Sequence, residues 1–212
     1  MTPTIGEEAV FSVGQTRGKR NAEELLFDFH GVRVTDCYGA YKNLKGLHQI
    51  CWAHLARTAR DIAESGALSD HARAICTDFY HTLSTVYQEI RAVCEASYDQ
   101  QTRDRQAMIL AEKIHSLTDE DVLDAPKKLT DLKERLRRYE HALFTCVTIP
   151  GIPPDNKAER KLRHLVLKRK NSFGTKTEKG SHVFEINASV LLSAWWTNRA
   201  QWFPHVDGLL RG

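Results

Sequence analysis

The chain of 212 residues contains 42% hydrophobic residues, which is enough to bury the core of one large domain or of two small ones. Its net charge is only +3, its five cysteines are irregularly spaced, and its first residues lack the basic-then-apolar pattern of a secretory signal. The longest apolar stretch, residues 186–196, is too short to cross a bilayer. We therefore expect a cytoplasmic protein of a reducing compartment that has no membrane contact.

The first 66 residues alternate apolar runs with helical patterns. The predicted strands are residues 9–13, 31–36 and 47–52. The predicted helices are residues 19–29, 38–46 and 53–64. Strands that alternate with helices favour an α/β fold with at least some parallel pairing, and Asp36 ends the second of these strands.

The next part of the chain, residues 67–150, reads as helical throughout. One stripe of apolar residues at steps of three and four comprises Ala72, Ile75, Phe79, Leu83, Val86, Ile90 and Val93. A second comprises Leu129, Leu132, Leu136, Tyr139 and Leu143, and predicts one helix before the break at Pro150. A shorter helix is predicted between them, at residues 106–117. We interpret the stripes as core packing between paired helices rather than as a face that binds a partner.

The last part, residues 151–212, predicts a helix that contains Glu159, a strand at residues 165–169 and an amphipathic helix around residues 182–199. The chain is therefore expected to form three regions, 1–66, 67–150 and 151–212, with the all-helical region inserted into an α/β fold.

Positive charge is concentrated between Lys157 and Lys179. Nine Lys and Arg residues stand there against Glu159 and Glu178, which gives +7 and leaves −4 for the rest of the chain. Such a segment on a nearly neutral protein suggests a polyanionic partner, nucleic acid first, although a solvated basic helix face gives the same pattern.

Two acids stand out by position. Asp36 ends a buried-looking strand, where α/β folds place ligands, and Glu159 lies on a helix beyond the helical region. Carboxylates brought together in this way could hold Mg²⁺ or Mn²⁺, because hard cations prefer oxygen ligands. The alternatives are a turn residue for Asp36 and a favourable helix-dipole position for Glu159.

Three stretches give these acids a context. The stretches are VTDCYGAYKNL, CWAHLARTARD and PDNKAERKLRHLVLKRKNSFGT. From about residue 12 onward, their order and spacing resemble bacterial transposases of the insertion-sequence-66 type, which belong to the DDE class with an RNase H-like catalytic domain. The resemblance implies that Asp36 and Glu159 are the second and third catalytic acids, that they bind Mg²⁺ or Mn²⁺, and that the reaction is cleavage and strand transfer of DNA. It also implies that the helical region is an insertion before the last acid.

The basic segment is then expected to bind phosphates of duplex DNA, at the element ends and at the target. The candidate residues are Lys157, Arg160, Lys161, Arg163, Lys168, Arg169 and Lys170. A second transposase protomer is another partner to consider, whereas no small-molecule substrate is expected.

Cys51 and His54 form a C-x-x-H pair, which is half of a zinc-binding spacing. No second half follows in the chain, so zinc is not expected. Several DDE superfamilies carry a similar pair after the second acid, which implies a place for His54 near the active site. Cys51 could equally be a small buried residue.

The family's first catalytic Asp is expected upstream of the motif around Asp36. The acids available before it are Glu7, Glu8, Glu23, Glu24 and Asp28, and none stands on a strand edge. We therefore expect an N-terminally truncated transposase that lacks the first strands of the sheet and is inactive alone. The alternative is a non-catalytic DNA-binding remnant; an RNA-binding module is not supported, because no aromatic motif of the RNP type is present.

Overall fold

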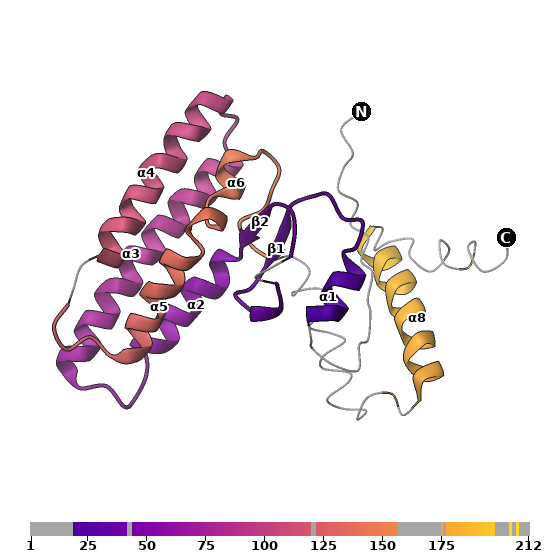
Figure 1. Ribbon diagram of the computed structural model, residues 1–212, viewed down its shortest axis with the longest axis horizontal. Coiled ribbons are helices and arrows are strands. Elements are labelled where there is room, and N and C mark those ends of the chain that lie inside the picture. Colours follow the sequence, from indigo (N-terminus) through magenta and orange to yellow (C-terminus); the bar gives the residue numbers. More distant parts are fainter. Residues whose placement is uncertain are drawn as a thin grey trace. The chain divides into compact units, whose positions relative to one another are not determined.

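The computed structural model describes residues 19–41, 44–119, 122–156, 175, 177–197, 204 and 207 (Figure 1). The chain divides into two compact units. One is Phe27–Asn156, and the other combines Met1–Leu26 with Lys157–Gly212. Each unit is described by itself.

The first unit begins with two short parallel strands, β1 (Arg33–Thr35) and β2 (His48–Ile50), in which Val34 pairs with Gln49. The prediction of parallel pairing is confirmed, although both strands are shorter than predicted. The described residues contain no further strand and are mostly helical, so they are compatible with an α/β fold built on a small sheet.

In the described part of the connection between the strands, the chain forms the 3₁₀ turn η1 (Gly39–Tyr41), whereas a helix over residues 38–46 was predicted. The buried guanidinium group of Arg33 holds this connection by donating to the carbonyl oxygens of Leu44 at 2.7 Å and Gly46 at 3.2 Å. Gly46 has a φ of +95°, a backbone conformation that glycine adopts without steric cost. The chain thereby returns to the start of β2.

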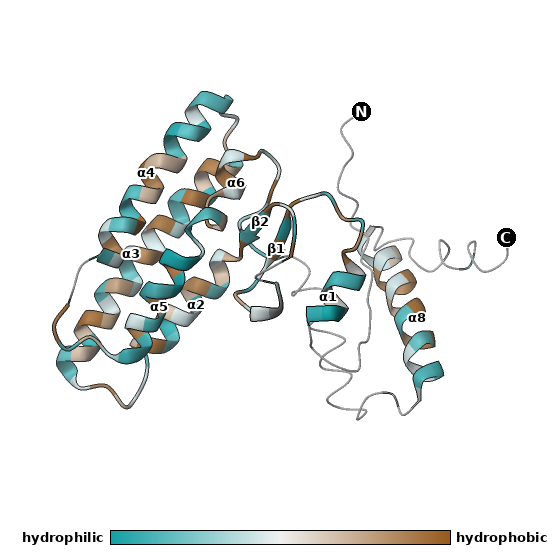
Figure 2. Cartoon of the chain, in the orientation of Figure 1, coloured by the Kyte–Doolittle hydropathy of each residue, from teal (hydrophilic) through white to brown (hydrophobic). Residues whose placement is uncertain are grey.

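Four helices follow the sheet and lie side by side (Figure 1): α2 (Trp52–Ala63), α3 (Asp70–Glu95), α4 (Gln100–Asp119) and α5 (Lys127–Arg138). Each helix packs on the next, and α5 packs back on α2, so that the four form a closed bundle. Apolar and polar residues alternate along these helices as expected for a bundle with one shared core (Figure 2).

Helix α3 follows the predicted stripe with one exception. The buried residues are Ala72, Cys76, Phe79, Leu83, Val86, Ile90 and Val93, so Cys76 takes the place predicted for Ile75. The helix begins at Ser69, whose hydroxyl oxygen accepts a hydrogen bond of 3.2 Å from Ala72 N–H. This N-cap satisfies one of the free N–H groups of the first turn.

The prediction of one helix through Leu143 is wrong. Helix α5 ends at Arg138, because the backbone of Tyr139 (φ −105°, ψ 14°) leaves the helical conformation. The 3₁₀ turn η2 (Glu140–Ala142) and the short helix α6 (Thr145–Thr148) follow. Leu143 is nevertheless fully buried in the core cluster, so the apolar pattern predicted burial correctly but not the helix.

The other unit contains α1 (Lys19–Leu25) and α8 (Glu178–Thr197), which confirm the helices predicted at 19–29 and 182–199 with different ends. The strands predicted at 9–13 and 165–169 and the helix predicted at Glu159 lie outside the described residues. Among the helices of the described part, none has the length and hydropathy needed to span a membrane.

Candidate active site

Asp36 directly follows β1, at the carboxyl edge of the parallel sheet, as the sequence predicted. Its Oδ1 accepts a hydrogen bond of 3.0 Å from Tyr38 N–H, and its carbonyl oxygen accepts one of 2.8 Å from the hydroxyl group of Thr35. The side chain is half-buried, and within the described part of the chain it forms no ion pair. The turn therefore fixes the carboxylate at the edge without neutralising it.

Cys51 lies beside Asp36, because its N–H donates to the carbonyl oxygen of Thr35 at 2.8 Å and so extends the pairing of the two strands. Burial raises the pKa of Cys37, the residue after Asp36, to about 11; the guanidinium of Arg135 opposes this shift, and Asp36 adds to it. Burial also raises the pKa of Cys51. Both thiols are therefore protonated at neutral pH as long as no metal is bound.

His54 lies in the first turn of α2. Its backbone N–H donates to the carbonyl oxygen of Cys51 at 3.2 Å, and its carbonyl oxygen accepts from the hydroxyl group of Thr58 at 2.8 Å. The structure thus brings Cys51 and His54 into one turn after β2, while a role for His54 in the chemistry stays a prediction. Within the described ranges, no cluster of three or more His, Cys, Asp or Glu side chains could hold a metal ion.

The segment that precedes Glu159 docks at the same edge of the sheet. The carbonyl oxygen of Pro154 accepts a hydrogen bond of 3.0 Å from Trp52 N–H, and Oδ1 of Asp155 accepts one of 3.1 Å from Ala53 N–H. These are the first two N–H groups of α2, which lack partners inside the helix. A carboxylate is also favoured at this positive end of a helix. Asp155 therefore caps a helix that begins about a hundred residues earlier in the chain.

Two further contacts hold this segment. The N–H of Asn156 donates to the sulfur of Cys51 at 3.2 Å. The hydroxyl group of Tyr87, on α3, lies 2.8 and 2.7 Å from the two carboxylate oxygens of Asp155. Burial and this hydrogen bond to a carboxylate raise the pKa of Tyr87. The contact between Tyr87 and Asp155 could not be predicted from the sequence, because only the fold brings the two residues together.

The other predicted site residues lie outside the described residues. They are Glu159, Lys157, Arg160, Lys161, Arg163, Lys168, Arg169 and Lys170. Their roles stay predictions.

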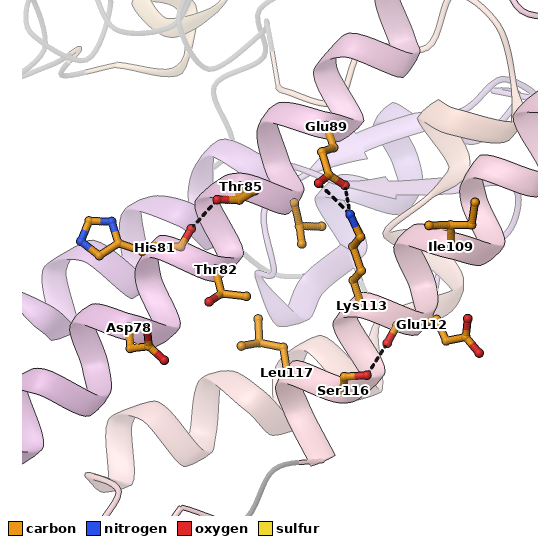
Figure 3. A pocket seen from close by; sticks show the side chains of 11 residues that line it. Asp78, His81, Thr82, Thr85, Glu89, Ile109, Glu112, Lys113, Ser116 and Leu117 are labelled. Carbon is orange, nitrogen blue, oxygen red and sulfur yellow. Dashed lines mark hydrogen bonds and ion pairs between the residues drawn. The ribbon is translucent and has the colours of Figure 1, made fainter.

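A groove of about 980 Å³ between α3 and α4 contains none of the predicted site residues. Figure 3 shows Lys113 of α4 reaching across it to Glu89 of α3, with a shortest N–O distance of 2.6 Å. Asp78, His81 and Glu112 also line it. The ion pair links the two helices of the bundle across the groove.

The fold and site define a helix-rich α/β protein with an acid at the edge of a parallel sheet and a distant segment docked beside it. The family model described as Transposase IS66 family matches residues 4–183, which is most of the chain. The chain therefore belongs to this transposase family, as the motifs around Asp36 and Glu159 suggested. No curated protein and no solved structure matched the chain. Membership in a transposase family implies DNA as its partner.

Proposed function

We propose that the chain contributes two metal-binding acids, Asp36 and Glu159, to the metal-dependent cleavage and strand transfer of DNA in an RNase H-like active site of the DDE class, where they are ligands of Mg²⁺ or Mn²⁺. The observation that supports this proposal most directly is the docking of residues 154–156 at the edge of the sheet where Asp36 lies. The segment that leads to Glu159 starts at this edge.

The covalent chain limits where Glu159 can be. Glu159 is three positions after Asn156, and a fully extended chain spans at most about 3.6 Å per position, or about 11 Å in all. Asn156 is hydrogen-bonded to Cys51, which pairs with the residue before Asp36. A metal site shared by Asp36 and Glu159 is therefore within the reach of this segment.

The chemistry of the edge fits a hard cation. Asp36 offers carboxylate oxygens, which are the ligands that Mg²⁺ and Mn²⁺ prefer. When bound, such ions activate the attacking oxygen and stabilise the leaving oxygen in phosphodiester chemistry. Asp36 and Glu159 would hold the ions, and the basic residues between Lys157 and Lys170 would bind the DNA phosphates and so bring the scissile bond to them.

Thermal unfolding in the presence of Mn²⁺ tests the site. We expect Mn²⁺ to raise the melting temperature of the chain, because an ion that binds only the folded state stabilises that state. Asp36→Asn and Glu159→Gln should each remove this rise. The control is Asp61→Asn, since Asp61 is an exposed acid on α2 outside the site. If both site variants keep the full rise, the assignment of the two acids is wrong.

Cleavage of the protein by iron gives a second, independent reading. Fe²⁺ bound in place of Mg²⁺ reduces added hydrogen peroxide to hydroxide and hydroxyl radicals, with ascorbate to regenerate Fe²⁺, and the radicals cut the backbone close to the ion. The proposal predicts cuts near residues 36, 51–54 and 154–159, and loss of these cuts in Asp36→Asn. Cuts confined to other parts of the chain would place the metal elsewhere.

A further inference from the structure

The contact between Tyr87 and Asp155 joins the helical bundle to the segment that leads to Glu159. The two residues are 68 positions apart, and the Tyr87 hydroxyl lies within 2.8 Å of both oxygens of the carboxylate. The same carboxylate accepts from Ala53 N–H at the start of α2. Asp155 is thus held by two helices at once.

The position of the Tyr87 hydroxyl is itself fixed by the core. The Tyr87 ring stacks on the indole of Trp52, with an angle of 10° between the ring planes and 6.4 Å between the ring centroids. Trp52 is fully buried, and its indole N–H donates to the carbonyl oxygen of Leu143 at 2.7 Å. A shift of the Tyr87 ring would therefore disturb its packing on a fully buried side chain at the start of α2.

The residue that follows Asp155 lies at the edge of the sheet where the metal site is proposed. Asn156, the residue after Asp155, is hydrogen-bonded to Cys51 at the edge that carries Asp36. Glu159 follows three residues later. Tyr87 and Asp155 thus hold the start of the segment that contains Glu159.

We propose that Tyr87 and Asp155 are positioning residues through which the helical bundle holds residues 154–156, the start of the segment that contains Glu159, at the edge of the sheet where Asp36 lies. This inference rests on the proposed function. A contact that only stabilised the bundle would not need to include the residue just ahead of the Glu159 segment. The helical region then acts as a support for the metal site and is more than a spacer in the chain.

The test is Tyr87→Phe, which removes the hydroxyl group and keeps the ring on Trp52. The matched control is Tyr80→Phe, a half-buried tyrosine two turns earlier on α3. We expect Tyr87→Phe to weaken Mn²⁺ binding about tenfold, the loss typical of residues that orient metal ligands, with little change in the metal-free melting temperature. The control should bind Mn²⁺ like the wild-type chain. A lower melting temperature with unchanged Mn²⁺ affinity would mean that the contact is only structural and would overturn the inference.

Asp155→Asn provides a second variant, because the amide oxygen can still accept from Ala53 N–H. It should weaken Mn²⁺ binding as Tyr87→Phe does. The double variant should bind Mn²⁺ no more weakly than the weaker-binding of the two single variants. Additive losses would show that the two residues act separately, against the inference.

Hydrogen exchange distinguishes this inference from the proposed function. If the wild-type chain binds no Mn²⁺, the proposed metal site fails, and the positioning role is decided by amide exchange in residues 154–163. Faster exchange there in Tyr87→Phe, but not in Tyr80→Phe, supports positioning. Equal exchange in the wild-type chain and Tyr87→Phe overturns it.

Discussion

The indole N–H of Trp52 donates a hydrogen bond of 2.7 Å to the carbonyl oxygen of Leu143, although 91 residues separate the two. The same oxygen accepts from Nε2 of Gln49 at 3.0 Å, and Oε1 of Gln49 accepts from Cys146 N–H at 2.7 Å. The hydroxyl group of Thr145 completes the set by donating to the carbonyl oxygen of His48 at 2.7 Å. All of these residues are buried. These four hydrogen bonds, called the polar seam below, fix β2 and the start of α2 against Leu143 and α6.

Replacing Trp52 with Phe should lower the free energy of unfolding by about 2–4 kcal/mol, because it removes a buried hydrogen bond and leaves a cavity in a fully packed position. Urea unfolding measures the change. Trp195→Phe on α8, where the side chain is 37% exposed, should cost less than about 1 kcal/mol. Equal losses in the two variants would show that the seam adds little to stability.

His48 should make the stability of the chain depend on pH. Burial, together with the charges of Arg33 and His141, lowers the pKa of His48 to about 4. The unfolded chain binds a proton at this residue below its ordinary pKa of 6.5, whereas the folded chain does not. Stability is therefore lost as the pH falls from 6.5 towards 4, by up to about 3 kcal/mol in total.

The comparison that isolates this effect is His48→Gln. The difference in unfolding free energy between the wild-type chain and the variant should be constant above pH 7 and should shrink as the pH falls to about 4. A difference that stays constant over this range would show that His48 titrates alike in the folded and the unfolded chain.

The tautomer of His48 follows from the geometry. The Thr35 hydroxyl donates to the Asp36 carbonyl oxygen, so the hydroxyl oxygen of Thr35 accepts from Nε2–H of His48 at 2.7 Å.

The basic segment should bind duplex DNA without sequence preference, and the affinity should fall steeply with salt. Each phosphate contact adds about −0.9 to the slope of log affinity against log salt. Replacing Arg160, Arg163, Lys168 and Arg169 with Ala should flatten the slope by about three to four units on this basis. Fluorescence anisotropy of a labelled duplex at several salt concentrations measures the slope.

A matched control changes the same number of charges on the bundle. It replaces exposed cations with Ala at Arg57, Lys113, Lys127 and Lys128. This control should retain the wild-type slope, because a general change in net charge is not a contact with a phosphate. If the two variants flatten the slope equally, the basic segment is a solvated face rather than the DNA-binding surface.

Much of the bundle could be predicted from the sequence, because its helices bury stripes that repeat every three or four residues. The stripe of α3 was predicted with one error: Ile75 is only half-buried, and Cys76 is 1% exposed. Both residues fit steps of three and four between Ala72 and Phe79, so hydrophobicity alone favoured Ile75, and the contacts of the folded bundle select Cys76.

The end of α5 could not be predicted in this way. Leu143 continues the apolar pattern, but its carbonyl oxygen accepts hydrogen bonds from Gln49 and Trp52 instead of forming part of a helix. Such long-range hydrogen bonds cannot be recognised in the local sequence. The same holds for the site. The position of Asp36 at a strand end followed from local pattern, whereas the docking of Asp155 on α2 and Tyr87 depends on contacts across 102 and 68 residues.

The polar seam also sets an order of folding. Helix pairs such as α3 and α4 are neighbours in the chain and can form early, since closing a short loop costs little entropy. Gln49 and Trp52, in contrast, must wait for residues 143–146, which leave the ribosome roughly 5 to 20 seconds later at about 5–20 residues per second. During that interval the polar groups of β2 and α2 that the seam later pairs face solvent. The edge that carries Asp36 is thus completed last, only after the whole helical region has been made.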